Sequence, residues 1–257
     1  MKSWIAGYHP VLEVLRAGRR KTYQIALLEK EGSKGKGAID GEIEKLAVKA
    51  NIPLQWYPRS FFQKTSPIEV HQGVMAQVDP CPLLGLEDLA SAIKVEKKVH
   101  FILILDEIQD PQNLGALLRS ASCFGVRWVI LPSQRTPPLE ASVVKASAGA
   151  TEYLSIVSVT NLAQTIDFLK EIGFWIYGLV PQGGGDFSEQ EFGDRVALVV
   201  GSEGKGIRRL VQEKCDFLLT FSTMGFIQSL NASVAGAIGM YEIFKSLKLL
   251  EKIHKPS

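Results

Sequence analysis

Continuous apolar runs that alternate with helical segments constrain the fold of this chain more than any other feature. Three of these runs, at residues 99–105, 128–131 and 196–200, contain almost no polar side chain. A strand with one face in water would alternate apolar and polar residues, so these runs predict strands buried on both faces. Because the intervening segments have helical periodicity, the sequence predicts an α/β domain whose parallel sheet is covered by helices on both sides.

The same patterns give the order of elements in this domain. Further strands are expected at residues 153–157, 174–180 and 217–221. Helices are expected to end near residue 124, to span 141–148, 162–172 and 207–214, and to close the chain after residue 231. Ligands of parallel sheets usually bind beyond the carboxyl ends of the strands, so polar residues that follow a strand are the candidates for a functional site.

A second, smaller α/β domain is predicted before this one. It comprises helices at residues 10–17, 40–50 and near 60, with strands at 22–28, 53–57 and 73–78. Residues 79–98 begin Asp-Pro-Cys-Pro and continue as a charged helical pattern, which marks a linker. We therefore predict domains at residues 1–78 and 99–257, joined by residues 79–98.

Composition excludes several classes of protein. With 46% apolar and 22% charged residues, the 257-residue chain is expected to be globular. No apolar stretch is long enough to span a bilayer and the start of the chain has no apolar signal core, so we expect a cytoplasmic protein without a membrane contact. The three cysteines and four histidines are scattered without ligand spacing, so we expect neither disulfides nor a metal site.

Charge is distributed unevenly between the two predicted domains. Residues 1–78 carry 12 Lys and Arg against 7 Asp and Glu, whereas residues 79–257 carry 17 against 20. Positive side chains gather in turns of the small domain and in a glycine-rich loop, at Arg16, Arg19, Arg20, Lys21, Lys34 and Lys36. Such loops suit the phosphate backbone of a nucleic acid. A solvated protein surface would have the same composition, and charge alone leaves that alternative open.

Three strand ends carry polar residues that apolar packing does not explain. The first spans residues 106–125, where Asn113 can cap a helix that Gly125 ends. Within this helix Arg119 is a lone charge among apolar residues, and a buried Arg must pair with an anion. The anion could be a ligand or a carboxylate of the protein itself.

The second strand end, at residues 199–207, reads Val-Val-Gly-Ser-Glu-Gly-Lys-Gly-Ile. Glycines after a strand allow a sharp turn and a close approach of a ligand to the backbone. The spacing fits neither a dinucleotide-binding loop nor a P-loop. Glu203 would repel a phosphate, so it favours a ligand with a cationic group or an arginine partner.

The third strand end, at residues 221–244, joins a strand to the last helix. Ser229 or Asn231 can cap this helix, which has small residues along one side at Ala232, Ala235, Gly236 and Gly239. Because each interior Gly costs a helix about 1 kcal/mol relative to Ala, another backbone or a ligand is expected to pack closely there. An ordinary helix cap without function is the alternative.

Taken in order, these three stretches resemble the three motifs of the SpoU family, also called TrmH, of RNA ribose 2′-O-methyltransferases. The family belongs to the knotted SPOUT class, and the resemblance covers residues 99–248. The segments Gly-Tyr-His-Pro-Val-Leu-Glu-Val-Leu at residues 7–15 and His-Gln-Gly-Val at 71–74 further resemble the RNA-binding extension of the bacterial enzymes that methylate a guanosine of 23S rRNA.

This resemblance implies a C-terminal parallel-sheet SPOUT domain with a trefoil knot, preceded by a small α/β RNA-binding domain. It also implies S-adenosylmethionine as cofactor, a homodimer, and structured RNA as substrate, 23S rRNA in particular. By position in the motifs, the catalytic residues would be Asn113, Arg119, Glu203, Ser229 and Asn231, and the residues lining the cofactor pocket would be Gly201, Phe221 and Leu230.

The resemblance also assigns roles. Arg119 would remove the proton of the ribose hydroxyl or bind the phosphate of the target nucleotide, and Glu203 would orient Arg119 or the cofactor. Ser229 and Asn231 would hold the ribose and the loop, and Asn113 would fix the start of its helix.

The chain departs from the family pattern in the third motif, which usually reads Ile-Pro-Met before the glycine. Here the residues are Phe221, Ser222 and Thr223, and Gln228 replaces a frequent acidic residue. Loss of the proline is expected to loosen the loop, and the larger Phe221 is expected to reshape the adenine pocket. Two other functions therefore stay open: methylation of tRNA, and a non-catalytic RNA-binding role in ribosome assembly.

Overall fold

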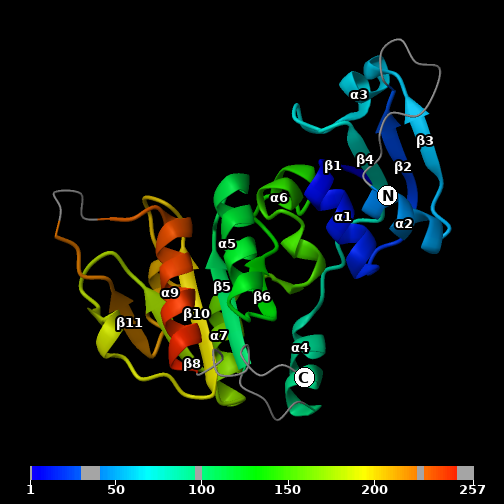
Figure 1. The fold of residues 1–257 in the computed structure, drawn as a ribbon. Coiled ribbons are helices and arrows are strands. Elements are labelled where there is room, and N and C mark those ends of the chain that lie inside the picture. Colours follow the sequence, from blue (N-terminus) through cyan, green and yellow to red (C-terminus); the bar gives the residue numbers. More distant parts are fainter. Residues whose placement is uncertain (1, 30–40, 96–99, 225–228, 248–257) are drawn as a thin grey trace. The chain divides into compact units, whose positions relative to one another are not determined.

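The computed structural model describes residues 2–29, 41–95, 100–224 and 229–247. The chain forms two compact units (Figure 1). Unit 1 contains Met1–Pro82 and Pro138–Tyr153, and unit 2 contains Leu83–Pro137 and Leu154–Ser257. The expected basic loop with Lys34 and Lys36, and Gln228 of the third motif, lie outside the described residues.

Unit 1 is built on a four-stranded sheet. Its strands are β1 (Ser3–Ala6), β2 (Thr22–Leu28), β3 (Leu54–Tyr57) and β4 (Val74–Val78), in the order β1-β4-β2-β3. Strands β2 and β3 are parallel, and β4 is antiparallel to both of its neighbours. The helices α1 (Tyr8–Ala17), α2 (Gly41–Lys49) and α3 (Arg59–Thr65) complete it. The prediction of a small α/β domain is confirmed, although strand β1 was not predicted.

Residues 138–153 belong to unit 1 although they lie between two strands of unit 2 in the sequence. They form α6 (Ala141–Ala146) and the short 3₁₀ helix η1 (Ala150–Glu152). Val144 of α6 packs into the same apolar cluster as Ile5 and Val11. Arg20 forms a two-pronged ion pair with Glu152, and both side chains are only 1% exposed. A buried pair of this kind is strongly destabilised when one partner is lost, so Arg20 has a structural role.

Unit 2 is built on a seven-stranded sheet in which every strand pair is parallel, as predicted. The strand order is β7-β6-β5-β10-β8-β11-β9. The strands are β5 (His100–Asp106), β6 (Trp128–Pro132), β7 (Ser155–Val159), β8 (Trp175–Leu179), β9 (Gly185–Asp186), β10 (Arg195–Gly201) and β11 (Phe217–Thr220).

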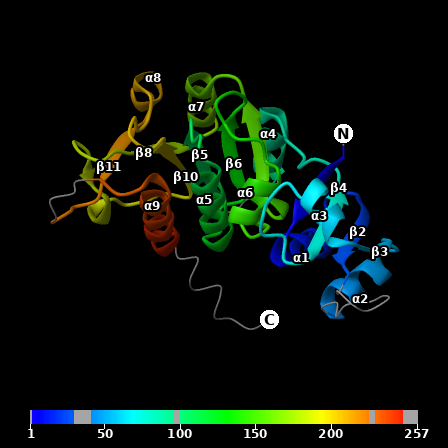
Figure 2. The same cartoon turned by 90° about the horizontal axis from the view of Figure 1, so that it is seen from above.

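Helices cover both faces of this sheet, which confirms the second part of the prediction (Figure 2). On one face, α4 (Leu86–Val95), α7 (Leu162–Glu171) and α8 (Arg209–Gln212) pack on an apolar cluster that includes Ile102, Ile130 and Val199. On the other face lie α5 (Pro111–Cys123) and α9 (Ala232–Ser246), which contact each other. Within the described residues, no helix has the length and apolar character needed to cross a membrane.

The small residues of α9 are explained by its close packing. A Cβ atom added at Gly236 would come closer than 3.0 Å to Cδ2 of Leu117 on α5, which is fully buried. A Cβ at Gly239 would lie 3.3 Å from Cδ2 of Leu198 on β10. Close packing is therefore confirmed, but at Gly236 and Gly239 the neighbours are side chains of α5 and β10, not the backbone or ligand that was expected.

This packing predicts that the two glycines respond differently to the same substitution. Alanine at either position gains about 1 kcal/mol of helix propensity, but overpacking a buried site costs about 1–3 kcal/mol. Gly236→Ala is therefore expected to be less stable than Gly239→Ala by at least about 1 kcal/mol in urea unfolding followed by circular dichroism. Equal stability of the two variants would contradict the packing described for α9.

Candidate active site

Helix α5 begins with a cap that frees Asn113 for another contact. The capping side chain is that of Asp110, whose Oδ1 accepts the Asn113 backbone N–H at 2.7 Å, and Pro111 is the first helical residue. The prediction that Asn113 caps the helix is therefore wrong. Asp and Asn are about equally good caps, but Pro is favoured as the first helical residue, so the Asp110-Pro111 pair in the sequence already favoured Asp110. Asn113 instead donates through Nδ2 to Oε2 of Glu203, at 3.0 Å.

A tight turn after β10 positions Glu203. The backbone groups of Ser202 and Gly206 exchange two hydrogen bonds, at 3.1 and 2.9 Å, so the chain folds back on itself. The turn passes so close to Gly201 that any Cβ there would clash with the backbone of Gly206 and Ile207. Gly201 therefore permits the turn, and Glu203 stands within it.

An ion pair anchors the other end of this turn. Asp106, at the end of β5, is fully buried and accepts both the backbone N–H and the side-chain Nε of Arg208, each at 2.8 Å. Arg208 was not predicted as a site residue. Two features of the sequence pointed to it: Arg208 lies shortly after the glycine-rich turn, and Asp106 places a carboxylate at the end of a predicted strand. The turn is thus fixed to β5 on one side and closed over Gly201 on the other.

Asn231 joins the third motif to the same carboxylate. Its Oδ1 accepts the backbone N–H groups of Ser233 and Val234, at 2.9 and 3.4 Å, so the prediction that it caps the last helix is confirmed. Its Nδ2 donates to Oε2 of Glu203, at 3.1 Å. One carboxylate oxygen therefore accepts amides from Asn113 and Asn231, and the three predicted motifs meet at Glu203.

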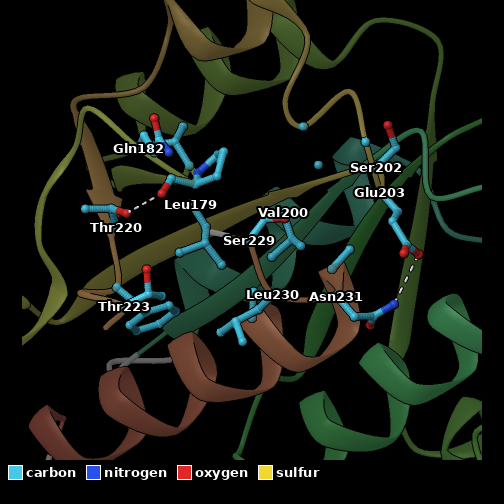
Figure 3. Close-up of a pocket in the computed structure, with 18 residues that line it drawn as sticks. Leu179, Gln182, Val200, Ser202, Glu203, Thr220, Thr223, Ser229, Leu230 and Asn231 are labelled. Atoms are coloured by element: carbon cyan, nitrogen blue, oxygen red, sulfur yellow. Dashed lines mark hydrogen bonds between the residues drawn. The ribbon is translucent and has the colours of Figure 1, made fainter. Parts of the chain in front are cut away.

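A pocket of about 490 Å³ opens beside this junction, at the carboxyl ends of β8, β10 and β11. It is lined by all the predicted cofactor residues, Gly201, Phe221 and Leu230, and by Glu203, Ser229 and Asn231. In Figure 3, Gln182, Thr220 and Thr223 lie on one side, Ser202 and Glu203 on the opposite side, and Val200 and Leu230 between them. The pocket thus has an apolar middle and polar ends, which suits a ligand with one flat apolar part and polar groups around it.

Asn113 lies outside this pocket and lines a smaller hollow of about 220 Å³ that shares Ser202 and Glu203 with it. Glu203 therefore stands between two adjoining depressions.

Arg119 lies apart from both depressions. It is six residues after Asn113, which on a helix is about 9 Å along the axis and about 120° around it. Its side chain is exposed, so the expectation of a buried, lone charge is wrong. Among the described residues it makes no ion pair or hydrogen bond. The alternative to a ligand contact was a salt bridge between Arg119 and a carboxylate of the protein itself. Within the described residues no such salt bridge is found.

The altered third motif is held by contacts that sequence analysis missed. Phe221 stacks on Phe187, with ring centroids 4.9 Å apart and planes at 22°. The Ser222 hydroxyl donates to Oδ2 of Asp186 on β9, at 2.6 Å. Two hydroxyl groups lower the pKa of Asp186 to about 2 by hydrogen bonding to its carboxylate. The Ser188 hydroxyl has the larger effect and the Ser222 hydroxyl the second largest. The serine at the position usually held by proline therefore ties the loop to a neighbouring strand, so the expectation of a looser loop is not supported at Ser222.

Comparison with known proteins decides the family. Residues 100–241 match the profile of the SpoU rRNA methylase family, and residues 4–84 match the profile described as RNA 2′-O ribose methyltransferase substrate binding. This chain belongs to the SpoU family. A Bacillus subtilis protein, YacO, whose name assigns it to the TrmH family of tRNA/rRNA methyltransferases, is 40% identical over 242 residues, covering 94% of this chain and 95% of its own.

Solved structures show the same fold. AviRb of Streptomyces viridochromogenes, a SpoU methyltransferase in complex with AdoMet, has a TM-score of 0.77 and 18% identity, covering 98% of this chain and 91% of its own. An AdoMet-bound rRNA methyltransferase of Sinorhizobium meliloti has a TM-score of 0.77 and 20% identity, covering 95% and 87%.

The SpoU family uses S-adenosylmethionine, and the residues of the pocket fit this cofactor. Leu179, Val200 and Leu230 offer an apolar surface to a purine ring, and Thr220 and Gln182 offer polar groups at one end. The carboxylate of Glu203 complements the positive charges of the cofactor. Among the described residues no cluster of His, Cys, Asp or Glu is arranged to hold a metal ion.

The Ser222 contact yields a prediction about acidity. A carboxyl whose pKa is lowered by native hydrogen bonds stabilises the fold above its ordinary pKa of 3.8, and this contribution is lost as the pH falls toward 2. Ser222→Ala should raise the pKa of Asp186 part of the way toward 3.8, because the Ser188 hydrogen bonds remain. Thr223→Ala, which removes a neighbouring hydroxyl without a bond to Asp186, is the control. A carboxyl carbon titration by NMR that gave the same pKa in Ser222→Ala would refute the contact.

Proposed function

We propose that this protein methylates a ribose 2′-hydroxyl of structured RNA, at a guanosine of 23S rRNA, in the manner of the RlmB group of the SpoU family. The observation that carries the proposal is the junction at Glu203, where the three motifs of the family meet beside a pocket at the strand ends. S-adenosylmethionine, when bound, supplies a methyl group on a positively charged sulfur.

The residues of the junction have binding and positioning roles in this proposal. Gly201, Phe221 and Leu230 line the cofactor pocket, and Glu203 places a negative charge at its edge. Asn113 and Asn231 hold that carboxylate through their amides, so its position is fixed before a ligand arrives. Ser229 and Asn231 present polar groups to the ribose of the substrate.

Arg119 contacts the RNA in this proposal. A guanidinium holds its proton too firmly to be a favourable base, whereas it binds a phosphate readily, so the phosphate of the target nucleotide is its simpler ligand. Removal of the hydroxyl proton by Arg119 would require surroundings that favour its neutral form. Because Arg119 does not line the pocket of its own chain, either role requires the RNA, or the pocket of a second copy, to approach it.

A homodimer is part of the proposal. Helix α9 presents Val234, Ile238 and Tyr241 to solvent, with 47%, 37% and 42% of each residue exposed. Their spacing of four and three residues places them on one face of the helix. A second copy of the chain covering this face would bury apolar side chains next to α5, which carries Arg119.

The choice of rRNA over tRNA rests on unit 1. The substrate-binding profile spans residues 4–84, and the rRNA methyltransferase of Sinorhizobium meliloti aligns with 95% of this chain, unit 1 included. In contrast, the solved TrmH/SpoU tRNA modifying enzyme of A. aeolicus covers only 67% of this chain with 89% of its own. A chain that keeps a separate substrate-binding unit is suited to a large, folded RNA.

A methyl-transfer assay tests the proposal. The protein is incubated with methyl-labelled S-adenosylmethionine and either unmodified 23S rRNA or bulk tRNA, and the labelled nucleoside is identified after digestion. The expected product is 2′-O-methylguanosine from 23S rRNA alone. Label in tRNA alone would keep the reaction and refute the substrate, whereas no label in either RNA would refute the enzyme.

Arg119→Ala in the same assay tests the role of this side chain. Because a group that aligns the substrate or moves its proton contributes about a hundredfold or more, turnover should fall by at least that factor. Arg209→Ala is the matched control, since Arg209 is an exposed arginine on α8, whose side chain is 89% accessible. If Arg119→Ala stayed within a few-fold of the unmutated protein, both roles proposed for Arg119 would be wrong.

A further inference from the structure

One face of the unit 1 sheet carries aromatic and amide side chains beside a small apolar cluster. The register pairs Gln77 of β4 with Trp4 of β1 and with Gln24 of β2. Gln55 and Tyr57 continue the same face on β3. The opposite face has the apolar cluster that packs against α1, α2 and α6, with Ile25, Leu27 and Val78 as members. The two faces of the sheet therefore differ in chemistry.

Helix α3 covers only one end of this face. Phe62 is fully buried against Ala6, Ala26 and Met75. Phe61 stacks on Tyr57, with centroids 3.9 Å apart and planes at 14°, and meets the ring of Trp4 edge to face at 5.8 Å. An aromatic group is thus formed by Trp4, Tyr57 and Phe61. All three of its side chains are partly exposed. Flat rings that remain accessible on a sheet face are suited to stacking with other flat rings.

Amide groups beside the aromatic group keep hydrogen-bonding capacity. The Tyr57 hydroxyl lies within hydrogen-bonding distance of Oε1 of Gln24, at 3.2 Å, and of Oε1 of Gln55, and Nε2 of Gln24 donates to Oε1 of Gln77 at 3.4 Å. Each carboxamide has two N–H donors. Among contacts within the described residues, Gln55 and Gln77 use only their oxygens. Their N–H groups are available to acceptors of a ligand, such as the ring nitrogens and carbonyls of a nucleobase.

Among the described residues of unit 1, some cations make no ion pair, and several of these lie beside this face. Lys2 lies 3.7 Å from the ring centroid of Tyr23, and strand alternation places Lys2 on the same side of β1 as Trp4. Arg59 and Lys64 are exposed on α3. In contrast, Arg16 pairs with Glu13 and Glu42, and Arg20 is buried with Glu152.

We propose that this sheet face binds unpaired bases of single-stranded RNA, which stack on the aromatic group and receive hydrogen bonds from Gln55 and Gln77. The proposal rests on the proposed function, because it names the part of an RNA substrate that unit 1 holds. Duplex RNA hides its base faces, so the face selects a loop or another unpaired segment. Positive side chains beside this face, those of Lys2, Arg59 and Lys64, contact the phosphates of the RNA backbone.

Binding of short RNAs to the full-length protein tests this inference. The probes are a fluorescein-labelled 12-nucleotide single strand and a 12-base-pair duplex, measured by fluorescence anisotropy at fixed salt. The single strand is expected to bind at least tenfold more tightly than the duplex. Trp4→Leu is expected to weaken single-strand binding by about tenfold, because it removes a ring on which a base stacks. Gln55→Glu is also expected to weaken it by about tenfold, because it replaces N–H donors with a negative charge that repels RNA.

Val48→Glu is the matched control for Gln55→Glu. Val48 is exposed on α2, which packs on the opposite face, and both substitutions add one negative charge. Val48→Glu is expected to change binding less than twofold. Because Gln55 is exposed and glutamate keeps the oxygen that bonds Tyr57, Gln55→Glu tests the face even where Trp4→Leu perturbs folding.

Equal binding of the single strand by Gln55→Glu and the unmutated protein would overturn the inference, as would equal binding of single strand and duplex. The methyl-transfer assay separates this failure from failure of the proposed function. If the unmutated protein labels RNA and the face variants bind RNA normally, the proposed function holds and only the inference about the sheet face is wrong. If the unmutated protein labels no RNA, the proposed function is wrong.

Discussion

The site depends on one carboxylate oxygen shared by two amides. Asn113 and Asn231 stand at the starts of α5 and α9, and both donate to Oε2 of Glu203 in the turn after β10. Three segments separated by 90 and 28 residues in sequence are thereby joined at one point. A negative charge is favoured at helix starts, where backbone N–H groups lack partners, so the carboxylate suits this place. The pocket proposed to bind the cofactor opens directly beside it.

Close packing makes this junction possible. Gly201 lets the turn fold over the end of β10, and Gly236 lets α9 approach Leu117 of α5. In unit 1 a buried ion pair has the corresponding role, because Arg20 and Glu152 connect residues 138–153 to the rest of that unit. Positive charge in the sequence is therefore no measure of phosphate binding here. Part of the basic charge of unit 1 is used to hold the unit together.

Sequence analysis predicted the parallel sheet because fully apolar strands have few other solutions, and it placed the three motifs at strand ends. It identified Asn231 as a cap but assigned the cap of α5 to Asn113 instead of Asp110. It could not find Asp186, since the partner of Ser222 lies 36 residues away and only the fold brings the two together. The exposure of Arg119 depends on how α5 is rotated against the sheet, which local apolar content does not determine. The trefoil knot stays a prediction, since local patterns carry no information on how one segment threads another.

Calorimetric titration of S-adenosylmethionine into the full-length protein is the decisive experiment, because it examines the pocket without requiring the correct RNA. One binding site per chain is expected. Leu230→Arg is expected to lower the affinity at least tenfold, because it places a charged side chain in the apolar middle of the pocket. Absence of binding to the unmutated protein, or equal affinity in Leu230→Arg, would contradict the assignment of this pocket.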